Sequence, residues 1–137
     1  MLTADLAPAL DIVRLSLHLL AASIWVGGQF VLAGLLPTLR GLGGDAPGRV
    51  ARAFGRLSWP AFAVLVATGV WNVSAVSHGQ PSAWQAVLGA KIVAVALSGL
   101  AAYLHSRSTG RAGLAAWGSI AGVATLAALV LGVALAG

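Results

Sequence analysis

Residues 17–37 read LHLLAASIWVGGQFVLAGLLP, a run of 21 residues without Asp, Glu, Lys or Arg. A helix needs about 20 apolar residues to cross the hydrocarbon core of a bilayer. The whole first segment extends over about 9–39, and three more apolar segments follow at about 57–77, 83–106 and 113–136. None shows the two-residue alternation of a strand, and only helices satisfy their own backbone in lipid. The sequence therefore predicts an all-α integral membrane four-helix bundle.

The composition supports the same class. Hydrophobic residues make up 59% of the 137 residues and charged residues 8%, whereas a soluble domain carries roughly 25% charged residues. The surface must face lipid, so the lipid bilayer is the expected partner and residues 1–137 form a single transmembrane domain. The opening residues, MLTADLAPAL, lack the basic region that begins a signal peptide, so we do not expect one.

The net charge of +5 arises from seven Arg, one Lys and three Asp. Six of the arginines fall in the first and third loops, and neither the second loop nor the C-terminal tail holds any: Arg40, Arg49, Arg52, Arg56, Arg107, Arg111. Basic loops stay on the cytoplasmic side. We therefore expect both termini outside a bacterial cytoplasmic membrane, and no role for nucleic acid as a partner.

A basic stretch, GRVARAFGRL, precedes the second apolar segment. Its apolar residues Val50, Phe54 and Leu57 fall at helical spacing with arginines between them. We predict an amphipathic interfacial turn over about 46–56, with Asp45 as its cap; the alternative is a solvated loop.

Polar residues within the apolar segments are few, and such residues are functional candidates. Asp11, Arg14, His18 and Trp25 share one helical face because they lie at offsets of three, four and seven. A neutral imidazole can ligate haem iron or copper, so His18 is a candidate ligand. The bland alternative is a histidine that makes one hydrogen bond inside the bundle.

Three further polar residues, which lie in other segments of the chain, are also candidates. Lys91, in the third segment, either extends its ammonium group towards the interface or pairs with a ligand anion such as a porphyrin propionate. His78, in the second loop, could join His18 as a metal ligand if that loop folds inward. His105 is interpreted as an interfacial anchor. Cys is absent and the only methionine is Met1, so soft copper ligands are missing.

Several motifs together resemble the copper resistance D (CopD) family of membrane proteins. The first segment has a histidine, a tryptophan seven residues later and two glycines: His18, Trp25, Gly27, Gly28. RAFGRLSWPAFAVLVATGVWN resembles the family's next segment through its Thr68–Gly69 pair, and GAKIVAVAL matches a Gly-x-Lys pattern at Gly89 and Lys91. The resemblance covers about 12–105 and implies copper binding or transport at the outer face through His18.

His18 and Lys91 also resemble the functional pair of the HemJ-type protoporphyrinogen oxidase, a haem-binding membrane protein. That resemblance implies haem b, with His18 as axial ligand and Lys91 at a propionate, and oxidoreductase activity. The chain departs from it in the two glycines after Trp25. Copper binding ranks first on the CopD resemblance. The alternatives are a haem b protein and a structural subunit of a homodimer or larger membrane complex, because a row of small residues in the last segment fits either internal packing or a dimer face.

The arginine distribution predicts the orientation of the chain. A periplasmically active reporter fused to the C-terminus should be active, because the tail lies outside. Activity of a cytoplasmic reporter at the same position would show that the chain has the opposite orientation.

Overall fold

The computed structural model describes residues 5–137; residues 1–4, which begin the segment that we distinguish from a signal peptide, lie outside the described residues. Within the described part, helices account for almost the whole chain and no strand occurs. The elements are α1 (Ala9–Ala22), the π-helical turn η1 (Ser23–Gly27), α2 (Gly28–Gly41), α3 (Ala46–Val76), α4 (Ser82–Arg107) and α5 (Arg111–Ala136). The predicted all-α class is confirmed.

Four helical rods are long and apolar enough to cross a membrane. The first joins α1, η1 and α2 into 33 continuous residues, α3 has 31, and α4 and α5 have 26 each. Large apolar side chains point outward along these rods, for example Leu19 at 66% and Val123 at 70% exposed. Water would penalise such a surface and lipid does not, so the chain is an integral membrane protein with four spanning helices.

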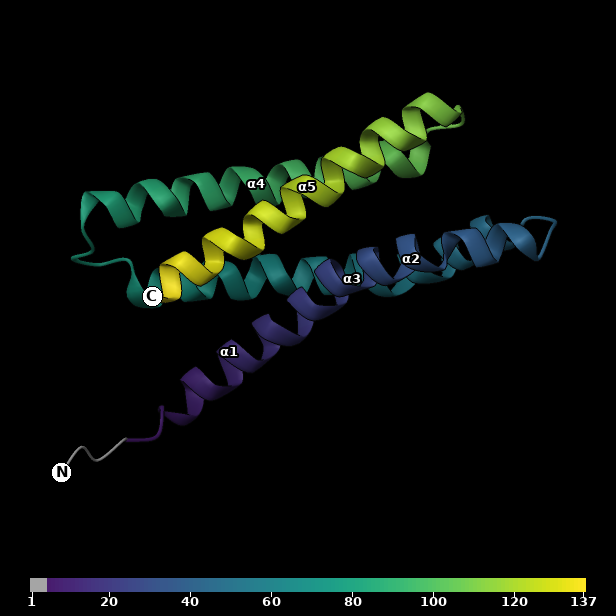
Figure 1. The fold of residues 1–137 in the computed structure, drawn as a ribbon. Helices are drawn as coiled ribbons and strands as arrows, with labels where there is room; N and C mark the ends of the chain where they lie inside the picture. The colour runs from purple at the N-terminus through teal and green to yellow at the C-terminus, as the bar shows by residue number, and fades with distance from the viewer. Residues whose placement is uncertain (1–4) are drawn as a thin grey trace. The chain divides into compact units, whose positions relative to one another are not determined.

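The helices fall into two compact units, Met1–His78 and Gly79–Gly137. In the first unit, α1, η1 and α2 pack against α3 after the turn at residues 42–45. In the second, α5 folds back along α4 after residues 108–110 (Figure 1). Each unit is thus a helical hairpin, as short connections between neighbouring antiparallel helices require.

Three of the four rods have the predicted bounds to within about two residues, and the second differs. The amphipathic stretch at 46–56 is helical, but it continues without interruption into α3 instead of forming a separate turn. Extending a helix adds one hydrogen bond for each residue, and no left-handed glycine interrupts this stretch as Gly43 and Gly44 interrupt the chain just before it.

The prediction that Asp45 caps this helix is confirmed in its position, but its side chain makes no capping hydrogen bond. Asp45 is the N-cap residue of α3, and its carbonyl group accepts a hydrogen bond from the Arg49 N–H at 2.9 Å. Its carboxylate makes no capping hydrogen bond and pairs with Arg52 at 2.7 Å. The carboxylate therefore serves an exposed ion pair two turns into the helix.

The α4–α5 hairpin packs through small side chains. The buried residues of α4 and α5 are nearly all small, which lets helices approach closely in lipid: Ala94, Ser98, Gly99, Ala101, Ala121, Ala124, Thr125. Hydrogen bonds join the hairpin near both ends. Trp84 Nε1 donates to the Leu135 carbonyl at 3.3 Å, and His105 Nδ1 donates to the Leu114 carbonyl at 2.8 Å.

In the first hairpin, Gly28 of α2 lies directly against the Phe54 side chain of α3. A Cβ on Gly28 would collide with the ring of Phe54, whereas a Cβ on the neighbouring Gly27 would meet nothing within 4 Å. The absent side chain at Gly28 therefore makes room for Phe54.

This difference predicts opposite effects for two adjacent substitutions. Gly28→Ala should lower the free energy of unfolding by about 1–3 kcal/mol, because the Phe54 ring must move. Gly27→Ala should be neutral or stabilising by up to about 1 kcal/mol, as expected for alanine in an unhindered helix. Thermal unfolding in detergent measures both; equal effects would contradict the assigned contact.

Candidate functional site

The only intramembrane histidine of the first unit lies at the contact between α1 and α3. His18 Nδ1 is 2.8 Å from Thr68 Oγ1, and this hydrogen bond joins two helices through residues that are 50 positions apart in sequence. Thr68 is buried, with 5% of its surface exposed, and His18 is partly buried. A Cβ on the next residue, Gly69, would lie 3.6 Å from His18 Cε1, an ordinary van der Waals contact.

The hydrogen bonds around Thr68 favour one tautomer of His18. Thr68 Oγ1 has two carbonyl acceptors within its own helix, Val64 at 2.7 Å and Leu65 at 3.2 Å. When its single proton is donated to either of them, the hydroxyl oxygen accepts from His18, and His18 Nδ1 then carries the proton. In the neutral imidazole, Nε2 is then the nitrogen with the lone pair. This is the arrangement in which a metal-ligating histidine donates its other ring N–H to a fixed partner.

One turn before His18, the predicted polar face carries a buried cation. Arg14 is 5% exposed, and its guanidinium contacts the Asp11 carboxylate at 2.9 Å. Its Nε is buried without a hydrogen-bond partner. A buried donor without a partner costs roughly 1–3 kcal/mol, so Arg14 has capacity for an acceptor that the first unit itself does not supply.

Trp25 occupies the other end of this face and is 3% exposed. Its ring centroid lies 4.4 Å from that of Phe62 and 5.3 Å from that of Trp59, so it packs in an aromatic cluster with α3. Its indole Nε1 is buried without a hydrogen-bond partner. Trp25 therefore stabilises the contact between η1 and α3 mainly through its apolar surface.

The helix widens into the π turn η1 over Ser23–Gly27, a feature that the residue spacing does not predict. Two side chains donate to carbonyl groups at this turn: Ser23 Oγ to Leu19 at 2.7 Å, and Gln29 Nε2 to Trp25 at 3.0 Å. Single π turns insert one residue, rotate the following helix face and are frequent at functional sites. The offset of seven from His18 to Trp25 therefore crosses an altered helical register.

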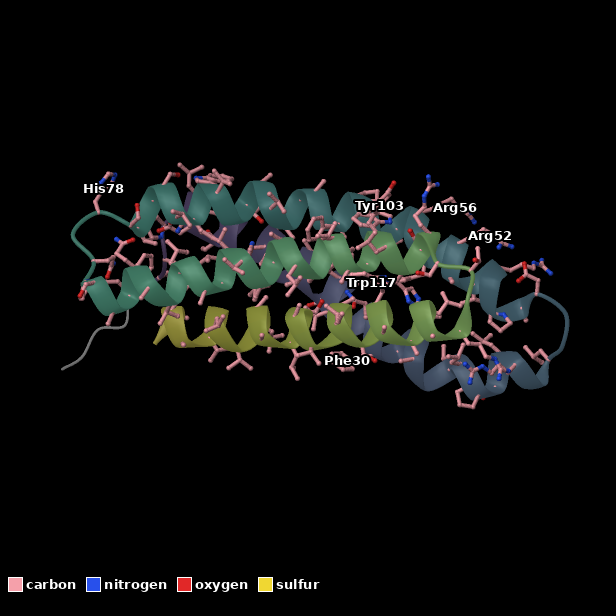
Figure 2. All side chains as sticks on the ribbon, turned by 90° about the horizontal axis from the view of Figure 1, so that it is seen from above. Phe30, Arg52, Arg56, His78, Tyr103 and Trp117 are labelled. Atoms are coloured by element: carbon pink, nitrogen blue, oxygen red, sulfur yellow. The ribbon has the colours of Figure 1, made fainter. Side chains whose placement is uncertain are left out.

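The remaining site candidates lie elsewhere in their units. His78 is exposed and lies beyond the end of α3 opposite to Arg52 and Arg56 (Figure 2). The helix rises about 12 Å between Thr68, the partner of His18, and Val76. The structure therefore does not bring His78 to His18, and their joint ligation stays a prediction.

Lys91 and His105 both belong to the second unit, where each packs on a glycine of α5. Lys91 Nζ would lie 3.1 Å from a Cβ on Gly132, and the His105 ring 3.1 Å from one on Gly118. His105 also uses Nδ1 to join α4 to α5, which agrees with its interpretation as an anchor.

Among residues 5–137, no group of three or more His, Asp or Glu side chains gathers to hold a metal ion. What the first unit offers is one oriented imidazole with a buried guanidinium one turn away. This donor set suits a metal centre that brings most of its own ligands.

Comparisons with known proteins add no relative. No family model matches the chain, and neither a curated protein nor a solved structure matches it. The structure shows an all-α integral membrane protein whose first hairpin is joined by a histidine–threonine hydrogen bond.

The role of Thr68 predicts a graded effect of two substitutions. Thr68→Val removes the acceptor while keeping the shape, leaving His18 Nδ1–H without it, and should cost about 1–3 kcal/mol of stability. Thr68→Ser keeps the hydroxyl group and should cost less than half as much. Thermal unfolding in detergent compares them, with Thr38→Val, at an exposed position of α2, as control. A Thr68→Val protein as stable as the Thr38→Val protein would contradict the assigned bond.

Proposed function

We propose that this membrane protein binds haem b, with His18 Nε2 as an axial ligand of the iron. The observation that carries the proposal is the hydrogen bond from His18 Nδ1 to Thr68 Oγ1, which directs the lone pair of the neutral ring to Nε2. Histidine is a common axial ligand of haem iron, and hydrogen bonding to its second nitrogen tunes the iron.

The polar groups near His18 support haem binding. Arg14, one turn from the imidazole, is ion-paired with Asp11 at 2.9 Å, so the pair carries no net charge. Haem would bring two anionic propionates that can accept further hydrogen bonds. Arg14 Nε, buried without a partner, would donate to a propionate oxygen, which is a favourable match for guanidinium.

Bound haem would supply one-electron chemistry. The protein would contribute the oriented axial nitrogen, a cation for the propionate and apolar surroundings that limit access of water. His18 lies in the half of the first rod farther from Arg40, so by the basic-loop rule the site would lie towards the outer face of a bacterial cytoplasmic membrane. Electron transfer, or porphyrin oxidation with Lys91 as a second functional group as the HemJ resemblance implies, are the reactions that we propose.

A second candidate function is copper binding or transport at the outer face through His18, with His78 as a further ligand. It is favoured by the CopD-like pattern of His18, Trp25, Gly27 and Gly28. A third role, as a structural subunit of a homodimer or larger membrane complex, requires no site.

Absorption spectroscopy of the purified protein, before and after addition of hemin, tests the proposal. The wild-type chain should show a Soret band with about one haem for each chain. His18→Ala should lose the band because the axial ligand is gone. His105→Ala should keep it, because His105 belongs to the α4–α5 hairpin and not to the unit that holds His18 and Arg14.

Metal analysis separates the other functions. If the chain stays colourless with hemin and holds stoichiometric copper that is lost in His18→Ala, the result would support copper binding and contradict haem binding. A colourless and metal-free chain that takes up neither would leave the structural role.

A further inference from the structure

A groove of about 450 Å³ opens in the first hairpin, and neither His18 nor Thr68 lines it. On one side it is lined by η1 and α2, including Ser23, Gly27 and Val31, and on the other by the first turns of α3. The α3 residues are Val50, Phe54 and Leu57, the apolar side of the amphipathic stretch. Its lining is almost wholly apolar, which suits a hydrocarbon chain.

Glycine creates the hollow. No atom lies within 4 Å of where a Cβ on Gly27 would be, so the space beside η1 is open. Gly28 meanwhile allows the Phe54 ring to lie directly against α2 and form one wall. The two neighbouring glycines thus have different roles, one leaving space and the other holding the wall in place.

The length of α3 places this groove at the edge of the hydrocarbon core. Residues 57–76 contain no charged side chain and would rise about 30 Å, the thickness of that core. Residues 46–56, which carry the arginines, therefore extend into the headgroup layer. Leu57 marks the boundary, and the groove extends to both sides of it.

Two arginines of α3 are neighbours in sequence of residues that line the groove. Arg49 precedes Val50 and Arg56 precedes Leu57 in the sequence, and both arginines are exposed. Arg52 is paired with Asp45. Among the ion pairs of the described residues, none involves the other two arginines of this helix, Arg49 and Arg56. Clusters of basic residues beside a spanning helix attract anionic lipid headgroups.

We propose that the groove and these two arginines bind one anionic phospholipid. An acyl chain would lie in the groove on Gly27, and the phosphate would contact Arg49 and Arg56 at the headgroup level. This site is independent of haem binding, because it shares neither His18 nor Arg14.

The second hairpin contains a groove of similar size that lacks neighbouring arginines. It has a volume of about 510 Å³ and is lined mainly by apolar residues of α4 and α5, among them Val93, Leu97 and Val123. No arginine adjoins its lining residues in the sequence, and the neighbouring Lys91 packs on Gly132. Shape alone would favour lipid binding at both grooves, whereas a preference for anionic lipid is expected at the first.

Native mass spectrometry of the purified full chain, titrated with phosphatidylglycerol or phosphatidylcholine, tests the site. Wild type should retain one phosphatidylglycerol in preference to phosphatidylcholine. Gly27→Leu fills the groove and should weaken this binding at least tenfold. Arg49→Gln with Arg56→Gln should weaken it about thirtyfold, since each basic residue near an anionic surface contributes roughly a factor of five.

Two matched controls make the result specific. Gly34→Leu adds the same side chain to α2 at an open position that does not line the groove. Arg107→Gln with Arg111→Gln removes the same charge from the other arginine-bearing loop. Both should bind phosphatidylglycerol like wild type. Equal retention of phosphatidylcholine by wild type, or equal losses in variants and controls, would overturn the proposal, and the haem spectrum would be unaffected either way.

Discussion

Lipid offers no hydrogen bonds, so a polar side chain within the spanning helices must find its partner inside the protein or in a ligand. In the first hairpin this constraint is met where α1 crosses α3: Thr68 donates to its own helix, and His18 donates to Thr68. The pair joins the helices and sets the orientation of the imidazole together. Arg14 in α1 and Trp25 in η1 each keep a buried donor without a partner, which makes this part of the first rod chemically distinct.

The helical architecture follows from features that the sequence displays directly. Apolar runs of spanning length, bounded by arginines or turn residues, predict the four rods, because backbone satisfaction in lipid leaves little choice. The start of α3 could not be predicted this way. Arginines at 49, 52 and 56 suggest a boundary at Leu57, but the backbone continues its helix through them, since charged side chains in the headgroup layer do not interrupt backbone hydrogen bonding.

The site was predictable only in part. Helical spacing identifies the face that holds Arg14 and His18, and the structure forms the Asp11–Arg14 ion pair on it. The partnership with Thr68 depends on the register between α1 and α3, which no local pattern specifies. The π turn could not be predicted either, because Gly27 and Gly28 are compatible with an ordinary helix. The side chains of Ser23 and Gln29, which donate to carbonyl groups near this turn, are the sequence features most closely associated with it.

The central claim is that Thr68 holds His18 with its proton on Nδ1 and its lone pair on Nε2. Nitrogen NMR of the protein labelled with ¹⁵N-histidine measures this directly, with His18→Ala used to assign the signals. The account predicts that, for the neutral ring of His18, Nδ1 gives the shift of a protonated nitrogen and Nε2 that of an unprotonated one. The opposite tautomer, or a ring unaffected by Thr68→Val, would contradict it.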